Sequence, residues 1–415
     1  MQRAVDEPLP TLDSIGVDTW GVDYALIGEN GSLLENPYHY RDTRTDGAMD
    51  AVFERVSRER IYSITGVQFM QINTLFQLCA ACRSTPRLMQ AADAVVTIPD
   101  LFNYWLTGKL CSEYTNATTT QLVDARSRTW ATELIGELGL PVRLFQTMVE
   151  PGTEIGMHRG TPVIAPACHD TGSAVASISM SRESVFLSSG TWSLFGAEVS
   201  EPVISEKTRG ANFTNEGGVC GTVRVLKNIA GLWLLQACRR CWKQDFSYEQ
   251  LMSASEGREA FRSLFNPDHA GFLHPESMVE AIADYCKGTE QPVPEDPPSY
   301  TRAILESLAL RYRSALESLE EITGIRFREI RIVGGGAKNR LLNQFTADAT
   351  GRVVVAGLVE ATALGNIAMQ MLATGAVGSL REARAVIDRS FPTERFEPSA
   401  GDLWDAAYRR FREYS

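Results

Sequence analysis

Short apolar strands alternate with longer helical stretches in both halves of the 415-residue chain. The clearest case begins with a helical stretch at 298–323, which leads to the strand REIRIV at 328–333. Three glycines and a helix from 338 follow, and then the strand VVVAG at 353–357 and a helix at 359–374. Because such alternation packs helices against sheets, the sequence predicts an α/β protein with two sheet-based lobes.

A turn-rich connection divides the chain into two parts. Residues 149–162 are rich in proline and glycine, which is typical of the approach to a domain boundary. We therefore expect an N-terminal lobe at 1–165, a C-terminal lobe at 166–390 and a final helix at 391–415. No short-period repeat appears in either part.

The start of the chain differs from that of an ordinary α/β domain. Residues 12–17 and 22–28 have the apolar character of two partner strands. A polar stub with two prolines, residues 1–11, precedes them. Since a domain of this class usually opens with its nucleating strand, we expect that the first strands of the fold are missing from this chain.

Composition indicates a folded, acidic protein. Hydrophobic residues make up 44% of the chain and charged residues 22%, and the net charge is −11. A nucleic-acid surface needs clustered Lys and Arg, and no such block occurs, so nucleic acid is not an expected partner. No apolar run is long enough to span a bilayer, and the opening residues lack the order of a secretory signal. The sequence therefore predicts a cytoplasmic protein with no membrane partner.

Eight cysteines include two C-x-x-C pairs, Cys79/Cys82 and Cys238/Cys241. Both pairs lie in stretches with helical periodicity, and no histidine follows at zinc-finger spacing. Nothing else in the sequence indicates an oxidising compartment. We therefore expect buried thiols on helix faces, with neither a metal site nor disulfides.

The segment GVDTWGVDYALIGENG places Thr19, Trp20 and Gly21 where one strand ends and the next begins. Polar groups at a strand end, beside a glycine that permits close backbone approach, suit a small polyhydroxylated ligand. A hairpin with an exposed aromatic side chain explains the same residues equally well.

The segment VIAPACHDTGSAV is an apolar strand that delivers His169 and Asp170 to its carboxyl end, with Thr171 in the first turn of a helix. A carboxylate at this place can accept the proton of a hydroxyl group that attacks phosphorus. Asp is also a common helix N-cap, and the residues alone favour that interpretation. A lone histidine is likewise more often structural.

Two glycine-containing turns are candidate phosphate or nucleotide contacts. In FLSSGTWSLFG, the amides around Gly190 and the hydroxyl of Thr191 suit phosphate oxygens, although a plain hairpin fits as well. In IRIVGGGAKN, three glycines separate a strand from a helix, a place where a nucleotide can lie against the backbone, and Asn339 is a polar candidate beside it. The pattern is neither G-x-G-x-x-G nor a P-loop, and close packing is an alternative role for the glycines.

These segments together resemble the FGGY family of carbohydrate kinases, whose members share the actin/hexokinase/Hsp70 (ribonuclease H-like) fold. The resemblance extends from about residue 12 to about residue 370 and keeps one order. Within the family, the segments are most similar to the branch that phosphorylates L-rhamnulose. The tokens that carry this similarity are DTWGVDY, YRDTRT, NTLFQL, EYTNATTTQL, CHDTGSAV, LSSGTWS, NEGG, LKNIAGLWLLQ, VGGGAKN and VEATALGNI.

The resemblance implies a role for each matching residue. Asp170 would accept the proton of the sugar 1-hydroxyl, and magnesium would bridge the phosphates of ATP without a protein ligand that we can assign. The implied sugar contacts are Gly21, Thr19, Trp20, His169, Thr171 and Asn228. The implied ATP contacts are Thr191, Gly190, Gln236, Gly334, Gly335, Gly336 and Asn339.

One departure from the family pattern concerns the opening. Members of the family begin with a strand–turn–strand unit that clasps the ATP phosphates, and nothing before Asp13 resembles it. We therefore expect a first lobe without that phosphate loop and a weak or inactive kinase, since loss of preorganised donors costs rate. The alternatives are a sugar-binding remnant without turnover and a kinase for another ketose, such as fuculose.

Overall fold

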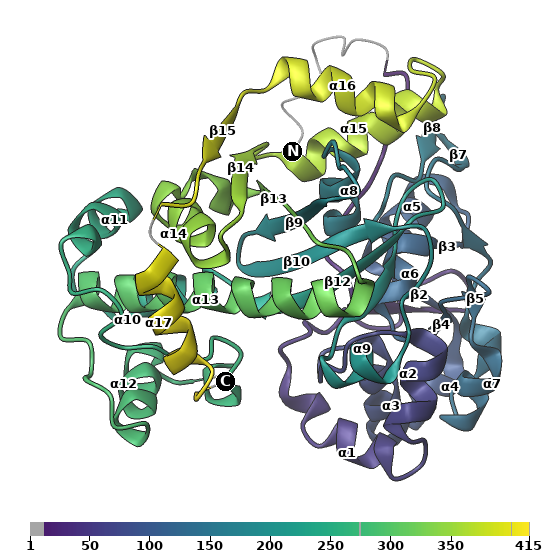
Figure 1. Cartoon of the computed structure of the whole chain (residues 1–415). Helices are drawn as coiled ribbons and strands as arrows, with labels where there is room; N and C mark the ends of the chain where they lie inside the picture. The colour runs from purple at the N-terminus through teal and green to yellow at the C-terminus, as the bar shows by residue number, and fades with distance from the viewer. Residues whose placement is uncertain (1–11, 274, 400, 415) are drawn as a thin grey trace. The chain divides into compact units, whose positions relative to one another are not determined.

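The computed structural model describes residues 12–273, 275–399 and 401–414 and has two compact units (Figure 1). The first unit comprises Met1–Ser179, Glu198–Val225 and Ala361–Ser390, and the second comprises Met180–Ala197, Leu226–Glu360 and Phe391–Ser415. The chain thus returns twice to the first unit, which the expected division into 1–165, 166–390 and 391–415 did not include. The polar stub at 1–11 lies outside the described residues.

The first unit contains a small antiparallel pair of strands and several short ladders. The described strands of this unit are β1 (Tyr24–Gly28), β2 (Ala92–Thr97), β3 (Ser112–Glu113), β4 (Val123–Asp124), β5 (Thr129–Trp130), β6 (Met148–Val149), β7 (Glu154–His158), β8 (Thr161–Ile164) and β11 (Thr214–Gly217). Its described helices are α1 (Ala48–Phe53), α2 (Arg58–Thr65), α3 (Thr74–Ser84), α4 (Pro86–Ala91), α5 (Ile98–Thr107), α6 (Tyr114–Thr119), α7 (Thr132–Glu137), α8 (Asp170–Ala176), α9 (Glu206–Gly210), α15 (Ala361–Ala373) and α16 (Leu380–Ser390).

The predicted pairing of residues 12–17 with 22–28 is wrong. β1 pairs antiparallel with β2, so that Leu26 lies opposite Val95. Residues 12–17 contribute only the isolated bridge from Ile15 to Val163. The sequence could not show this pairing, because β1 is buried along its whole length and its partner lies about 70 residues further along the chain.

The second unit is built on one mixed sheet. The strands of this sheet that belong to the unit follow the order β12-β10-β9-β13-β14-β15, where β10 is antiparallel to β9, β13 is parallel to both β9 and β14, and β15 is antiparallel to β14. The strands are β9 (Ser184–Ser189), β10 (Trp192–Val199), β12 (Val223–Ala230), β13 (Glu329–Val333), β14 (Val353–Gly357) and β15 (Thr393–Phe396). β9 and β14 begin and end where the sequence predicted strands.

Helices cover this sheet and extend away from it (Figure 1). They are α10 (Trp233–Cys241), α11 (Tyr248–Glu256), α12 (Met278–Gly288), α13 (Pro297–Thr323), α14 (Arg340–Thr350) and α17 (Gly401–Phe411). α13 packs on β10 through Tyr312, whose hydroxyl lies 2.7 Å from that of Ser193 and whose ring stacks on Phe195. The 27-residue α13 confirms the long helix expected from the sequence.

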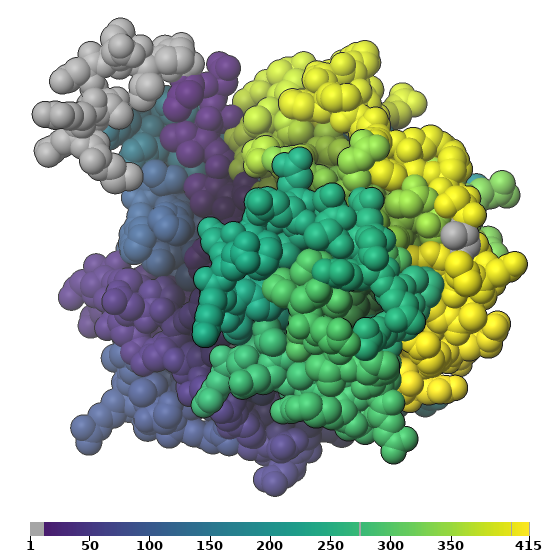
Figure 2. Space-filling model, turned by 90° about the vertical axis from the view of Figure 1, so that its left-hand side faces the viewer, coloured from purple at the N-terminus to yellow at the C-terminus, as the bar shows by residue number. Residues whose placement is uncertain are grey.

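The final helix expected at 391–415 is shorter in the structure, where α17 spans Gly401–Phe411 and the strand β15 (Thr393–Phe396) lies within the expected range. Arg313 on α13 donates to Asp405, at 2.6 Å, and the hydroxyl of Tyr408 donates to Glu317, at 2.7 Å. In the space-filling view, the yellow C-terminal residues lie against the green residues of the second unit (Figure 2). These contacts hold α17 against α13 in the second unit.

The expectation of buried thiols holds for one cysteine of each C-x-x-C pair, since Cys79 and Cys238 are buried whereas Cys82 is half-buried and Cys241 is exposed. Cys79 lies on α3 and Cys238 on α10, and burial raises the pKa of each to about 12. All eight cysteines are free. Among the described residues, no group of three His, Cys, Asp or Glu side chains is placed to hold a metal ion. None of the described helices combines the length and apolar character that crossing a lipid bilayer requires.

Two buried carboxyl groups of the first unit make its stability depend on pH. Burial raises the pKa of Asp100 and of Glu113 to about 7, whereas both groups ionise near about 4 in the unfolded chain. Between these values the folded protein binds more protons than the unfolded one. The free energy of unfolding should therefore fall as the pH rises from about 4 to about 7.

We expect Asp100→Asn to flatten this fall, because an amide does not titrate. Urea unfolding at several pH values between 5 and 7.5 measures the slope, and the exposed Asp13→Asn is the matched control. Equal slopes for Asp100→Asn, Asp13→Asn and the unmodified chain would show that the buried carboxyl of Asp100 does not titrate in this range.

Candidate active site

Backbone hydrogen bonds in the first unit join the two segments that the sequence singled out for sugar chemistry. The N–H of Thr19 donates to the carbonyl of Cys168, at 2.9 Å, and the N–H of Asp170 donates to the carbonyl of Thr19, at 2.8 Å. Thr19 and His169 form a parallel bridge. The structure therefore brings the predicted residues of segment 19–21 next to those of segment 169–171.

Asp170 is the first residue of α8, and its carboxylate is accessible. Its Oδ1 accepts hydrogen bonds from the N–H of Thr171, at 2.6 Å, and from the hydroxyl of Thr171, at 3.3 Å. The side chain of Asp170 is 45% exposed. His169 occupies the N-cap position, so the alternative that Asp170 serves as the N-cap residue is wrong. The carboxylate has room to receive a proton from a ligand.

Trp20 offers a flat apolar surface in the same segment. The indole is 45% exposed, and its Nε1 donates to Asp23 at 2.8 Å, while burial raises the pKa of that aspartate. A side chain at Gly21 would press against Thr119, whose hydroxyl accepts from the N–H of Val22 at 3.1 Å. A fixed and exposed aromatic ring suits contact with one face of a sugar.

Two side chains of α15, a helix that begins about 190 residues after Asp170, donate hydrogen bonds to residues at the two segments. The amide of Asn366 donates to Asp18 Oδ2, at 2.6 Å, and the hydroxyl of Thr362 donates to the carbonyl of Asp170, at 3.2 Å. Burial raises the pKa of Asp18, and the charge of Asp170 adds to this effect. A side chain at Gly365 would overlap the backbone of Ser173, so α15 and α8 are in close contact.

His169 is enclosed by charged groups that the sequence analysis did not single out. Its Nδ1 lies 3.2 Å from Glu216 Oε2 and 3.3 Å from Arg224 Nη2. Its Nε2 lies 3.5 Å from Asp170 Oδ1. Glu216 and Arg224 are themselves 3.2 Å apart and almost completely buried. The NEGG token, which carried no role of its own, included Glu216, and no token of the sequence analysis included Arg224.

Asn228 lies on β12, in the second unit. Its role as a sugar contact stays a prediction.

The second unit contains a pocket of about 720 Å³ around the two glycine-containing turns. Of the predicted ATP contacts, all but Gly334 line it. The lining residues are Gly190, Thr191, Leu232, Leu235, Gln236, Tyr248, Glu249, Met252, Ser253, Glu256, Gly335, Gly336, Lys338, Asn339, Arg340 and Leu341. Leucine and methionine side chains form an apolar wall, and backbone amides of the turns are within the same pocket, a combination that suits a nucleotide.

Close backbone contact shapes this pocket. Gly334 has a φ of +83°, which favours glycine, and a side chain at Gly336 would overlap the side chain of Ser189 on β9. Asn339 accepts from the N–H of Leu342, at 3.0 Å, and so caps α14 while lining the pocket. Gly334 and Gly336 therefore serve close packing against Ser189, and the same packing forms the pocket floor.

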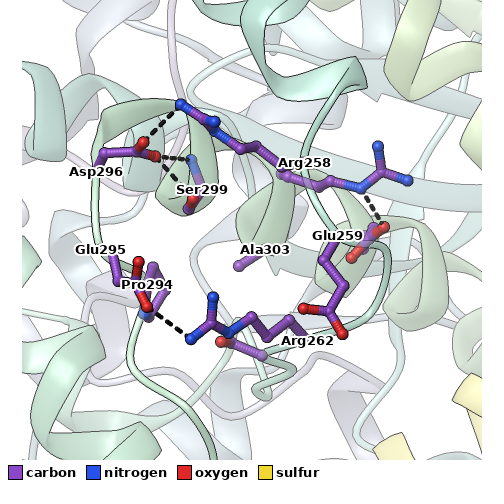
Figure 3. Close-up of a pocket in the computed structure, with 11 residues that line it drawn as sticks. Arg258, Glu259, Arg262, Pro294, Glu295, Asp296, Ser299 and Ala303 are labelled. Carbon is purple, nitrogen blue, oxygen red and sulfur yellow. Dashed lines mark hydrogen bonds and ion pairs between the residues drawn. The ribbon is translucent and has the colours of Figure 1, made fainter.

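A smaller pocket of about 140 Å³ in the second unit is lined mostly by charged residues (Figure 3). Arg258 donates to Asp296, at 2.5 Å, and Arg262 donates to Glu295, at 2.7 Å. Because these charges already neutralise one another, the pocket is a weaker ligand site than the larger one.

The N-terminal domain model of the FGGY family of carbohydrate kinases matches residues 5–170, and the C-terminal domain model of the same family matches residues 185–374. The chain belongs to the FGGY family of carbohydrate kinases. The two models meet between Asp170 and β9, about five to twenty residues after the boundary expected at 165.

Relatives with the name rhamnulokinase match along most of the chain. The rhamnulokinase of Bacteroides thetaiotaomicron is 47% identical over 413 residues, which cover 97% of this chain and 85% of the relative. That of Oceanobacillus iheyensis is 44% identical over 400 residues, which cover 94% of this chain and 85% of the relative. The match to the N-terminal family model begins at residue 5 of this chain, and the expected loss of an opening segment stays a prediction.

Solved structures of sugar kinases share the fold. A gluconate kinase from Lactobacillus acidophilus superposes with a TM-score of 0.82 at 16% identity, covering 99% of this chain and 85% of that one. A glycerol kinase from Plasmodium falciparum with ADP gives 0.76 at 17% identity, covering 97% and 84%. These likenesses confirm the actin/hexokinase-like α/β fold.

The pocket floor provides a test with a matched control. We expect Gly336→Ala to lower the free energy of unfolding by about 1 to 3 kcal/mol, because the added methyl group overlaps Ser189. Gly335→Ala should change it little, since nothing lies within 4 Å of the added atom. Chemical denaturation of both variants measures the difference. Equal stabilities would show that the turn has space behind it.

Proposed function

We propose that the chain transfers the γ-phosphoryl group of ATP to the 1-hydroxyl of L-rhamnulose, which gives L-rhamnulose 1-phosphate and ADP. The observation that carries this proposal is the accessible carboxylate of Asp170, joined by backbone hydrogen bonds to the segment of Thr19. The name of the relatives at 42–47% identity supports L-rhamnulose as the substrate. The similarity to these relatives gives no indication of the weak or absent activity that the sequence analysis expected.

Asp170 acts as the general base in this proposal. Its carboxylate takes the proton of the 1-hydroxyl while that oxygen forms a bond to the γ-phosphorus, and the bond from this phosphorus to the bridging oxygen of ADP breaks. Phosphoryl transfer depends mainly on positioning and charge stabilisation, so a single well-placed base is sufficient. The hydrogen bonds from Thr171 hold Oδ1 in place, and Oδ2 has no hydrogen bond to a described residue.

The sugar would lie against the residues that surround this carboxylate. The exposed ring of Trp20 would contact the apolar side of the sugar, which for a 6-deoxy ketose includes a methyl group. Thr19, Gly21, His169 and Thr171 would contact its hydroxyl groups. The support for these contacts is the backbone pairing of the two segments, which holds the backbone of segment 19–21 next to that of Asp170.

ATP would occupy the 720 Å³ pocket of the second unit. The amides near Gly190 and the hydroxyl of Thr191 would contact phosphate oxygens, and Gln236 and Asn339 would contact the nucleoside. Since the described residues offer no cluster for a metal, we propose that magnesium enters with the nucleotide, as this ion commonly binds through substrate phosphates.

The free thiols of all eight cysteines support a reducing compartment. We propose that the protein acts in the cytoplasm, where ATP is available as the phosphoryl donor.

Asp170→Asn tests the proposed base. We expect kcat with L-rhamnulose to fall by about 10²- to 10⁴-fold, because the amide cannot accept the proton. The affinity for ATP should be unchanged, since the nucleotide pocket shares no residue with this turn. A coupled assay of ADP release measures kcat, and calorimetry measures nucleotide binding.

The unmodified chain needs parallel assays with L-fuculose, L-xylulose and L-ribulose. Higher kcat/KM with any of these would show that the chain serves another ketose. Binding of L-rhamnulose without ADP release, with equal affinity in Asp170→Asn, would show a sugar-binding protein without turnover and contradict the proposed reaction.

A further inference from the structure

A buried ion pair between Glu216 and Arg224 contacts His169 in the first unit. Glu216 is on β11 and Arg224 is at the start of β12, and their side chains are 6% and 0% exposed. A fully buried ion pair rarely gives more stability than apolar side chains of the same size, because both charges lose their water. The position of this pair therefore points to a purpose other than stability.

The backbone leaves this pair little freedom. Arg224 Nε donates to the carbonyl of Gly217, at 2.9 Å, and the N–H of Gly217 donates to the hydroxyl of Thr118, at 2.9 Å. A side chain at Gly217 would overlap the ring of Tyr114. The NEGG segment at the end of β11 is thus pressed against α6, and the carboxylate of Glu216 and the guanidinium of Arg224, which is bonded to Gly217, are held in one place.

Both charges meet the same nitrogen of His169. Nδ1 lies 3.2 Å from the carboxylate of Glu216 and 3.3 Å from Nη2 of Arg224. The nearby positive charge of Arg224 and the hydrogen bond from His169 lower the pKa of Glu216, against the effect of burial. Glu216 therefore remains a carboxylate that can accept a proton from Nδ1, while Arg224 can donate to Nδ1 when that proton is absent.

The opposite nitrogen of His169 faces the proposed base. Nε2 lies 3.5 Å from Asp170 Oδ1. A lone pair on Nε2 would face the lone pairs of a carboxylate, which is unfavourable, whereas an N–H there is attracted to it. In the neutral ring, Arg224 donates to Nδ1, so the ring proton lies on Nε2. In the charged ring, both nitrogens carry a proton, and Glu216 accepts the one on Nδ1. Arg224 therefore favours the Nε2–H form of the neutral ring, and Glu216 stabilises the charged ring, in which Nε2 also carries a proton.

We infer that Glu216 and Arg224 are positioning residues that keep a proton on Nε2 of His169, directed toward Asp170 and the sugar oxygens. The inference rests on the proposed phosphorylation, in which Asp170 is the base. A donor at Nε2 holds the sugar oxygen beside that base and stabilises the negative charge that grows as the hydroxyl loses its proton. Glu216 and Arg224 act through His169 and need not touch the substrate.

The test uses Glu216→Gln, which keeps the size of the side chain and removes its charge. The amide can either donate to Nδ1 or accept from it, so it no longer selects one ring form. We expect kcat to fall about 10- to 100-fold, in the range seen when supporting groups of an active site are changed. The KM for ATP should not change. In a His169→Gln background, the same substitution should have no further effect on kcat.

Glu306→Gln is the matched control. Glu306 is also a buried carboxylate, 1% exposed, and pairs with Arg302 at 2.8 Å in the second unit. It should lose stability as Glu216→Gln does while keeping kcat. An unchanged kcat in Glu216→Gln, or an equal loss with and without His169, would overturn the inference and leave a structural role only.

A second readout does not depend on turnover. Nitrogen-15 NMR of the imidazole groups, with His169→Gln used for assignment, should show a proton on Nε2 of His169 in the unmodified chain and a mixture of tautomers in Glu216→Gln. A proton on Nδ1 alone in the unmodified chain would overturn the inference. Absence of any L-rhamnulose-dependent ADP release by the unmodified chain would instead contradict the proposed function, and the NMR result would then decide the inference by itself.

Discussion

One buried carboxylate, that of Glu113, holds the candidate sugar site together. It accepts four hydrogen bonds, from the N–H and hydroxyl of Thr115, the N–H of Asn116 and the N–H of Cys168. The first three fix the start of α6, and the last fixes the residue before His169. The hydroxyl of Thr115 in turn accepts from the N–H of His169, at 3.2 Å. Burial of this charge is costly, and the donors that surround it offset the cost.

The consequence is that the acid–base groups of the first unit are carried by backbone rather than by long flexible side chains. Asp170 and His169 stand on a turn whose amides are bonded to Glu113, Thr115 and Thr19. Groups held in this way need little reorganisation during reaction, which is the physical basis of preorganised catalysis. The pocket of the second unit is also shaped by backbone, because glycines let the turn at 334–336 approach β9 closely.

Local sequence reasoning found the elements but not their partners. The strands at 184–189 and 353–357, and the helix that became α13, carry strong apolar periodicity, so their place and type could be predicted. The predicted partner of β1 was wrong, because pairing depends on which distant strand shares a buried edge. The resemblance, and not the local pattern, selected Asp170 as a base, since residue type alone favoured a helix cap there.

The sequence by itself determined the α/β class, the position of most strands and helices, and the family through its ordered motifs. It did so because periodicity and turn residues are local properties. Only the tertiary structure decided that Glu216 and Arg224 contact His169, that Asn366 contacts Asp18, and that α15 returns to pack on α8. These contacts join residues about 50 to 350 positions apart in the chain, and no local pattern encodes which distant segments share one buried space.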